Sequence, residues 1–586
     1  MPKWLWFSIT ALVLTMLVML PILPAIQQNP EKNSGMFLYT AQQMVAGKML
    51  YKEVWDHKPP LIFAIDSLGL ILGKGGLWGI WGMQFLFYFL TALLMLSILT
   101  RFFSAFAAFF GVICATAALM VVNHGGNYSE NYALLFQAGA LWLAVYAGQN
   151  HKKTGRLYFA AGVLTGLVLM LKQSLIGFGV ALGIYLILRE IFRKKPHQWQ
   201  DVLGLSFGFG VTVLLFFGYF YLKGVFPDFW DAAFQYNLAY SRLGPLERIK
   251  ASLDVVEMLS AIPSFALAMA AWLSALLLIC WQFSYKAAGW LRKRNLAVVM
   301  VVAGTVWFLS ALLIERVTSR GVAGFGLLQW VSMVGGLLLA AAGAAAQRSR
   351  WMARLAGWLK CLNPPLQPEV VPLVTVTVLW FPIEILMAGF SGRTYVYYFI
   401  PLVPVTAFLL GVLAHMMAGQ TDWRITVPHL VAVSLLVVVM AAPMISFFDA
   451  LKPGSDSQID ASVQAILKNS KPGDTVLTWG SEPLINFLAK RPQPSRYIHS
   501  WVFYTDHYAL NQRQSELLES LIEKKPVLIL DTQDPDAPFV EDLQECLYPS
   551  ETLPGNLGQV FDYICRSYVL LDHVGPEKWP IYRYEG

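Results

Sequence analysis

Long apolar runs recur along the chain from near its start and are separated by short polar connections. A run of about 20 apolar residues is long enough to cross a bilayer as a helix. By this rule the pattern predicts about 13 membrane-spanning helices. They are Trp4–Ile26, Trp78–Thr100, Ser104–Val122, Tyr132–Gly148, Leu157–Leu171, Leu175–Leu188, Val202–Tyr221, Phe265–Trp281, Leu296–Ile314, Val322–Ala346, Val370–Phe390, Tyr398–Met416 and Ile425–Phe447.

Basic residues cluster in alternate connections, at His151–Arg156, Arg193–Lys195, Leu291–Arg294 and Arg348–Arg354. Short loops rich in Lys and Arg stay in the cytoplasm. We therefore expect the amino terminus in the cytoplasm and, after an odd number of helices, the tail outside. The intervening connections then face outward: Gln27–Leu77, Asn123–Asn131, Leu222–Ser264, Glu315–Gly321 and Ser391–Tyr397.

The tail from Asp449 to Gly586 has a different pattern, in which short β-type runs alternate with helical stretches. The β-type runs are Thr475–Trp479, Val527–Asp531 and Tyr568–Asp572, and the helical stretches include Asp460–Lys468 and Ser515–Glu523. This alternation predicts a small α/β domain. The expected fold is a polytopic α-helical membrane protein, with a transmembrane domain over residues 1–448 and an exported soluble α/β domain over residues 449–586.

Composition supports the membrane assignment, since 56% of the 586 residues are hydrophobic and 13% are charged, with a mean hydropathy of +0.54. The expected location is the plasma (inner) membrane. The net charge of +7 is explained largely by the cytoplasmic loops, so it does not indicate a nucleic-acid partner. Cys546 and Cys565 both fall in the exported tail, where an oxidising environment favours a disulfide between them.

The first external connection is about 50 residues long, far beyond the usual length between bundled helices. Its stretch Ser34–Gly47 spaces apolar residues like an amphipathic helix ending at a glycine, which predicts a helix lying on the membrane surface. Further on, Tyr51–Phe63 reads YKEVWDHKPPLIF and places charged residues directly before two prolines. A long loop rich in aromatic residues is typical of a functional segment.

These residues resemble a known family. The run NSGMFLYTAQQMVAGKMLYKEVWDHKPPLIF is similar to the first external loop of GT-C membrane glycosyltransferases of the protein O-mannosyltransferase and lipid A aminoarabinose transferase superfamily, particularly bacterial members with a DHKPP motif. The segments NHGGNYSENY, FWDAAFQYNLAY and SGRTYVYYFIPLVP extend the resemblance. It implies a polyprenyl-phosphate sugar donor and a lipid, glycan or protein acceptor.

The chemistry of such a transfer selects candidate residues. A lipid phosphate leaving group needs fixed positive charge, which Lys58 and Arg393 supply at the outer membrane face. An acceptor hydroxyl needs a general base. The candidates for that base are Asp56, His57, Glu130 and His124.

One position departs from the family pattern, because Asn33 stands where the family usually has a catalytic aspartate. An amide is not a base at neutral pH. Either Glu31 or Asp56 then takes over this role, or the protein binds its lipid without the chemistry. The sequence favours Asp56 acting with Glu130, because both lie in the best-matched external segments.

Several candidates have structural alternatives. Asp56, His57 and Lys58 could form a solvated turn, Glu130 could stabilise a helix N-terminus, Arg393 could anchor at the interface, and Lys172 could extend to the lipid head groups. Glu384 lies inside a predicted span, where an acid usually has a function such as lining a cavity or pairing with Arg393. The remaining substrate-binding candidates are Asn33, Tyr397 and Tyr398. A divalent cation such as Mg²⁺ or Mn²⁺ is a further candidate ligand of Glu130.

Two other classes of function remain open. A lipid flippase or transporter would place ionisable groups near the bilayer midplane and show inverted repeats, whereas the polar residues here lie at the outer ends of the helices. A non-catalytic protein that binds or assembles lipid-linked sugars is compatible with Asn33.

Overall fold

The computed structural model describes residues 3–123, 125–149, 154–192, 199–240, 244–287, 369–418, 427–452, 454, 456–504, 508–535, 537–538 and 553–586. Within these ranges, every predicted membrane span corresponds to a helix. The helices are α1 (Lys3–Met19), α4 (Leu77–Phe102), α5 (Ala105–Val122), α6 (Ser129–Gln149), α7 (Thr154–Leu171), α8 (Gly177–Ile191), α9 (Gln200–Leu222), α13 (Pro263–Ala287), α17 (Val371–Gly389), α18 (Leu402–Ala418) and α19 (Val427–Ala450).

Six helices of the described residues are long and apolar enough to cross a membrane, or seven if the bent pair formed by α12 (Pro245–Ser260) and α13 is one span. The predicted spans Leu296–Ile314 and Val322–Ala346 lie outside the described residues. The full count of about 13 spans therefore stays a prediction.

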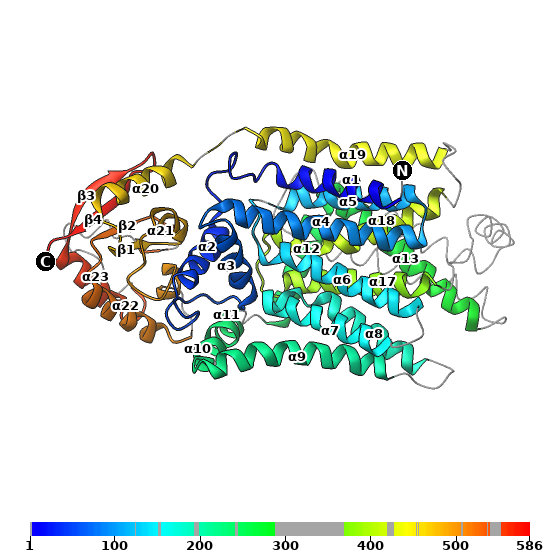
Figure 1. The fold of residues 1–586 in the computed structure, drawn as a ribbon, viewed down its shortest axis with the longest axis horizontal. Coiled ribbons are helices and arrows are strands. Elements are labelled where there is room, and N and C mark those ends of the chain that lie inside the picture. Colours follow the sequence, from blue (N-terminus) through cyan, green and yellow to red (C-terminus); the bar gives the residue numbers. More distant parts are fainter. Residues whose placement is uncertain are drawn as a thin grey trace.

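The long helices run side by side, and the C-terminal α/β region covers one end of the bundle (Figure 1). Between them lie α2 (Lys32–Val45) and α3 (Leu61–Leu72), with the short helices α10 (Phe226–Trp230) and α11 (Tyr236–Tyr240) nearby. The π-helical turn η2 (Asp231–Gln235) joins α10 to α11. The amino terminus lies at the opposite end of the bundle (Figure 1).

The C-terminal region contains a four-stranded sheet with the order β1-β2-β4-β3. Its strands are β1 (Val476–Trp479), β2 (Leu528–Asp531), β3 (Tyr568–Val574) and β4 (Trp579–Tyr584), and its helices are α20 (Ser457–Asn469), α21 (Pro483–Ala489), α22 (Leu510–Lys524) and α23 (Leu557–Ser567). Strands β1 and β2 are parallel and fully buried, whereas β4 pairs antiparallel with β2 and β3. Burial on both faces explains why most residues of β1 and β2 are apolar.

The first three strands coincide with the three runs predicted from the sequence. Strand β4 was not predicted, because Pro580 interrupts its run and proline disfavours a strand interior. It is tolerated here opposite His573, near the turn that joins β3 to β4.

Cys565 on α23 is disulfide-bonded, whereas Cys114 is a free, buried cysteine within α5. The predicted partner of Cys565, Cys546, lies outside the described residues. The pairing of these two cysteines therefore remains a prediction.

Helix α2 begins at the segment predicted to be amphipathic, but protein covers it instead of lipid. Phe37, Leu38 and Tyr39 are buried, and a Cβ on Gly35 would lie 2.6 Å from the Cβ of Leu484 in α21. The absence of a side chain at Gly35 thus permits close contact with the C-terminal region. The apolar face of α2 therefore packs against protein, between α3 and α21, and its place at the membrane surface stays a prediction.

The sidedness of the protein is open to a direct test. We expect an impermeant maleimide added to intact cells to label Ser457→Cys in a cysteine-depleted background, because this exposed residue begins α20 in the region expected outside. Protection of this cysteine in intact cells, together with labelling after lysis, would contradict the predicted orientation.

Candidate functional site

The DHK sequence of the first connection forms a buried chain of polar contacts. Asp56, which is 1% exposed, accepts a hydrogen bond from the Lys58 backbone N–H at 2.8 Å and lies 3.5 Å from His57 Nδ1. On the other side of the ring, His57 Nε2 lies 3.0 Å from Lys58 Nζ. The loop is held from two sides, since Tyr51 Oη donates to the Lys58 carbonyl and Asn237 Nδ2 donates to the His57 carbonyl. It is therefore not the solvated turn considered as an alternative.

Glu130 and Lys172 form a buried ion pair. Glu130 lies in the first turn of α6, and its Oε1 is 2.7 Å from the Nζ of Lys172, which follows the last residue of α7. The ammonium also lies 3.6 Å from the ring centroid of Tyr398 and 5.9 Å from that of Tyr397. Lys172 thus points into the protein, and the alternative in which it extends to the lipid head groups is not supported.

Glu31 occupies the start of α2, where it caps the helix. Its carboxylate accepts from the backbone N–H of Asn33 at 2.9 Å and from the Asn33 side-chain amide. Asn33 therefore supports an acid two residues away. The Tyr128 hydroxyl also bonds Glu31, and the Tyr128 ring stacks on Tyr397 at a centroid distance of 4.4 Å.

A glycine turn brings Glu31 next to the segment that carries Glu130. Gly125, Gly126 and Asn127 all have positive φ angles, which suits glycine and asparagine better than other residues. A Cβ on Gly125 would lie 2.8 Å from the Glu31 Cβ, so the approach depends on this glycine. The Ser34 hydroxyl donates to the Gly126 carbonyl at 2.8 Å and fixes the contact.

Burial and neighbouring charges shift the pKa values of several of these groups. The pKa of Lys58 is lowered to about 8, mainly by burial and then by the charge of Lys172, with Arg393 adding to the effect. Burial raises the pKa of Asp56 and of Glu31, and lowers that of His57. His57 is therefore neutral near pH 7, and its Nε2 can accept a hydrogen bond from the Lys58 ammonium.

The remaining predicted residues lie at varied distances from this cluster. Arg393 is exposed, donates to the Tyr395 hydroxyl at 3.2 Å, and acts electrostatically on Lys58 and His57. Glu384 is buried in α17 and accepts from the Trp380 indole at 2.7 Å. His124 lies outside the described residues.

A divalent cation at Glu130 stays an expectation from the sequence. In the ranges covered by the structure, no group of three or more His, Cys, Asp or Glu side chains could hold a metal ion. The Glu130 oxygen that would bind a cation already faces the Lys172 ammonium. We therefore assign no step to a metal.

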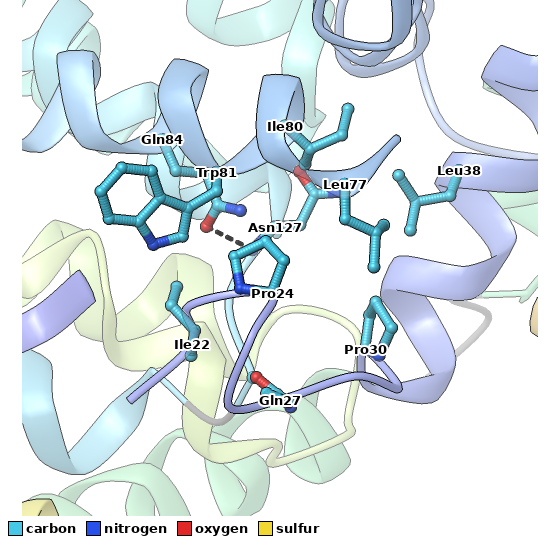
Figure 2. Close-up of a pocket in the computed structure, with 11 residues that line it drawn as sticks. Ile22, Pro24, Gln27, Pro30, Leu38, Leu77, Ile80, Trp81, Gln84 and Asn127 are labelled. Carbon is cyan, nitrogen blue, oxygen red and sulfur yellow. Dashed lines mark hydrogen bonds between the residues drawn. The ribbon is translucent and has the colours of Figure 1, made fainter. Parts of the chain in front are cut away.

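A buried polar network supports the 123–132 segment from behind. Gln84 of α4 accepts from the Asn127 backbone N–H at 2.8 Å, as Figure 2 shows beside a small cavity. The cavity measures about 30 Å³, which is roughly enough for one or two waters and too small for a sugar. The Asn127 side chain bonds both Asp66 Oδ2 at 3.0 Å and the Tyr132 hydroxyl at 2.7 Å. Asp66 was not predicted from the sequence, because its partners come from distant segments.

Asp66 gives a prediction for stability. It is fully buried, and burial raises its pKa to about 7, so the folded protein retains a proton that the unfolded chain releases near pH 4. Stability then falls as pH rises between these two values. We expect the Tm of Asp66→Asn minus the Tm of the wild type to increase by about 3 °C or more between pH 5 and pH 8.

Asp449→Asn is the control for this comparison, because the Asp449 side chain is 68% exposed. Thermal unfolding in detergent at both pH values measures the effect. A Tm difference between Asp66→Asn and the wild type that stays constant with pH would contradict it.

The C-terminal region also reaches the site, which the sequence did not indicate. The ring centroid of His499 lies 6.4 Å from that of His57, and Trp501 lies 5.9 Å from the same ring. The stretch YIHSWVF carries no spacing that signals a site, because its role depends on contact with a segment more than 400 residues earlier.

Comparisons with known proteins now add to this geometry. Residues 57–216 match the family model described as dolichyl-phosphate-mannose-protein mannosyltransferase. The comparison with curated proteins finds no match.

Among solved structures, the chain is similar to ArnT from Cupriavidus metallidurans bound to undecaprenyl phosphate, with a TM-score of 0.45, and to the same protein in the apo state, with a TM-score of 0.43. Sequence identity is 15% in both cases, and each alignment covers 99% of this chain and 97% of the other. The family match, which begins inside the DHKPP motif, supports membership of the GT-C membrane glycosyltransferase superfamily that the first external connection resembles.

Proposed function

We propose that the protein is a GT-C glycosyltransferase that moves a sugar from a polyprenyl-phosphate donor to an acceptor hydroxyl at the outer face of the membrane. The observation that carries the proposal is the grouping of Lys58 and Arg393 with the carboxylates Glu31 and Glu130 at one end of the helical bundle. The family match supports the donor class, because the description of that family names a dolichyl-phosphate sugar.

Lys58 and Arg393 are the groups best suited to the lipid phosphate. The Lys172 ammonium is already paired with Glu130. Among the described residues, the Lys58 ammonium has one hydrogen-bond contact, with the neutral ring of His57. Arg393 is exposed on the connection before η3 (Val396–Phe399), where a lipid head group has access. As the bond between the sugar and the phosphate breaks, the negative charge that develops on the leaving phosphate is stabilised by both cations.

Glu31 is the better candidate for the general base. It is partly exposed, its pKa is raised by burial, and it faces the same tyrosines as Glu130. In the reaction, the acceptor oxygen bonds to the anomeric carbon, the sugar–phosphate bond breaks, and the hydroxyl proton passes to Glu31. The acceptor thereby gains the sugar, the polyprenyl phosphate leaves, and no atom changes its oxidation state.

Asp56 is then a positioning residue for the phosphate-binding lysine. It lies beside His57 Nδ1, and the opposite ring nitrogen contacts Lys58 Nζ, so the carboxylate orients the ring that orients the ammonium. Its own backbone turn and its burial leave little access for an acceptor. This division of roles differs from the sequence hypothesis, in which Asp56 acts as the base.

Purified protein incubated with undecaprenyl phosphates carrying different hexoses tests the proposal. Release of undecaprenyl phosphate that depends on added lipid, glycan or peptide acceptor supports transfer. Stable binding of the lipid-linked sugar without release would instead support the non-catalytic binding protein. Movement of the lipid across vesicles without release would support a flippase.

A further inference from the structure

One segment of the C-terminal region is joined directly to the DHKPP connection. The backbone N–H of Trp55 donates to the Arg496 carbonyl at 2.8 Å, and Trp55 forms an isolated parallel bridge with Tyr497. Two residues further along, the His499 ring lies 6.1 Å from the Trp55 ring. The position of His499 at the site therefore follows from a backbone interaction.

The hydrogen bond that His499 accepts shows which of its ring nitrogens carries the proton. The indole Nε1–H of Trp501 donates to His499 Nε2 at 3.1 Å, and the two rings stack at a centroid distance of 5.0 Å. A nitrogen that accepts a hydrogen bond carries no proton, so the neutral ring has its proton on Nδ1. Burial, followed by the charges of Lys58 and Lys32, lowers the pKa of His499 to about 3, so the ring stays neutral at physiological pH.

The Nδ1–H group of His499 is a buried donor that needs an acceptor. The side chain is 2% exposed, and Nδ1 has no hydrogen-bond partner among the described residues. A buried donor without an acceptor costs free energy, which a bound ligand oxygen would recover. Its neutral charge and protonated Nδ1 exclude a role as a base at that nitrogen.

The surroundings of His499 suit a sugar. Aromatic rings pack around His499 between the two segments: the ring centroid of Tyr236 lies 5.8 Å from that of Trp501 and 5.1 Å from that of Trp55. Aromatic faces with a few placed polar groups are typical of pockets that bind small organic groups. Lys58, proposed to hold the donor phosphate, is close enough to influence the His499 charge.

We infer that His499 is a sugar-binding residue supplied by the C-terminal region, whose Nδ1–H donates a hydrogen bond to a sugar oxygen beside the phosphate held by Lys58. The inference rests on the proposed function and extends it. The sugar can belong to the donor or to a glycan acceptor, because both present the same hydroxyl chemistry. Binding and transfer assays separate these two sources.

Two substitutions isolate the donor at Nδ1. His499→Phe keeps a ring but no N–H group, whereas His499→Asn keeps an N–H donor near the position of Nδ1. Both remove the acceptor of the Trp501 indole, and only the asparagine variant keeps a donor, so weaker binding by the phenylalanine variant than by the asparagine variant reports the Nδ1 hydrogen bond. His573→Phe is the control, because His573 is an exposed histidine on β3 of the same region.

Binding is measured with bare undecaprenyl phosphate and with undecaprenyl phosphates carrying mannose, glucose or galactose. For the sugar-linked lipid that the wild type binds, we expect His499→Phe to weaken binding about tenfold, which is the effect of one hydrogen bond. Binding by His499→Asn should stay within about threefold of the wild type. Binding of the bare lipid phosphate should stay unchanged in both. If His499 contacts an acceptor sugar, donor binding stays unchanged and the acceptor KM shows the same difference.

Equal behaviour of the Phe and Asn variants in every assay would overturn the inference, as would equal weakening of bare and sugar-linked lipid. Wild-type protein that binds none of the lipid-linked sugars would overturn the proposed function itself, and this inference with it. His499→Met serves as a second variant without a donor if phenylalanine prevents folding, which thermal unfolding reveals.

Discussion

Glu31→Gln should lower the rate of sugar transfer by about 10²–10⁴-fold, the usual contribution of a general base. The glutamine carbonyl can still accept from the Asn33 N–H, so the start of α2 is preserved while the proton acceptor is lost. Asp56→Asn should reduce transfer by only about tenfold, because Asp56 acts on the phosphate-binding lysine only through its contact with the His57 ring. Initial rates at saturating donor, with expression levels matched, give the comparison.

The pH profile provides an independent readout of the same residue. Because burial raises the pKa of Glu31, the wild-type rate should fall as pH decreases through a value above 4.5, where the carboxylate becomes protonated. The residual activity of Glu31→Gln should lack this fall. If Asp56→Asn abolishes transfer and Glu31→Gln retains half of it, the base is Asp56 and the proposed division of roles is wrong.

Lys58→Met should lower turnover by about 10²–10³-fold, the loss typical of one preorganised electrostatic contact with developing charge. Binding of bare undecaprenyl phosphate should also weaken, because the ammonium attracts the phosphate before reaction. Lys52→Met, which removes an exposed charge from the same connection, is the matched control and should behave like the wild type.

Lys58→Arg separates charge from side-chain identity. With a pKa of about 8, Lys58 loses its charge as pH rises through that value, so wild-type transfer should fall on the alkaline side. Arginine remains charged to a much higher pH. The fall should therefore move upward in the arginine variant, and an unchanged alkaline limb would assign it to another group.

Local patterns were sufficient to predict much of the bundle and part of the site. The length of the apolar runs predicted the long helices, and the DHK residues lie close together because they are consecutive. Glu130 and Lys172 were each identified as candidates, but their pairing was not, since it depends on how α6 and α7 meet.

Other features depend on contacts between distant segments. The amphipathic pattern of α2 does not say whether lipid or protein covers its apolar face, and here α21 does. Asp66 and His499 have no sequence spacing that marks them, because Asn127 and Lys58 approach them only in the folded chain. The role of Asn33 as a support for Glu31 likewise required the geometry of a helix start.

The placement of α2 against the C-terminal region also sets the order in which the protein can mature. The Tyr39 hydroxyl accepts a hydrogen bond from the Gln493 backbone, 454 residues later in the chain. At ordinary rates of synthesis, that interval is roughly 20 to 90 seconds. Helix α2 therefore cannot reach its final packing until the segment that contains Gln493 has been translated. A ribosome-bound fragment that ends before the sheet would contain Lys58, Arg393, Glu31 and Glu130. It would lack Gln493, and with it the hydrogen bond that joins α2 to the C-terminal region.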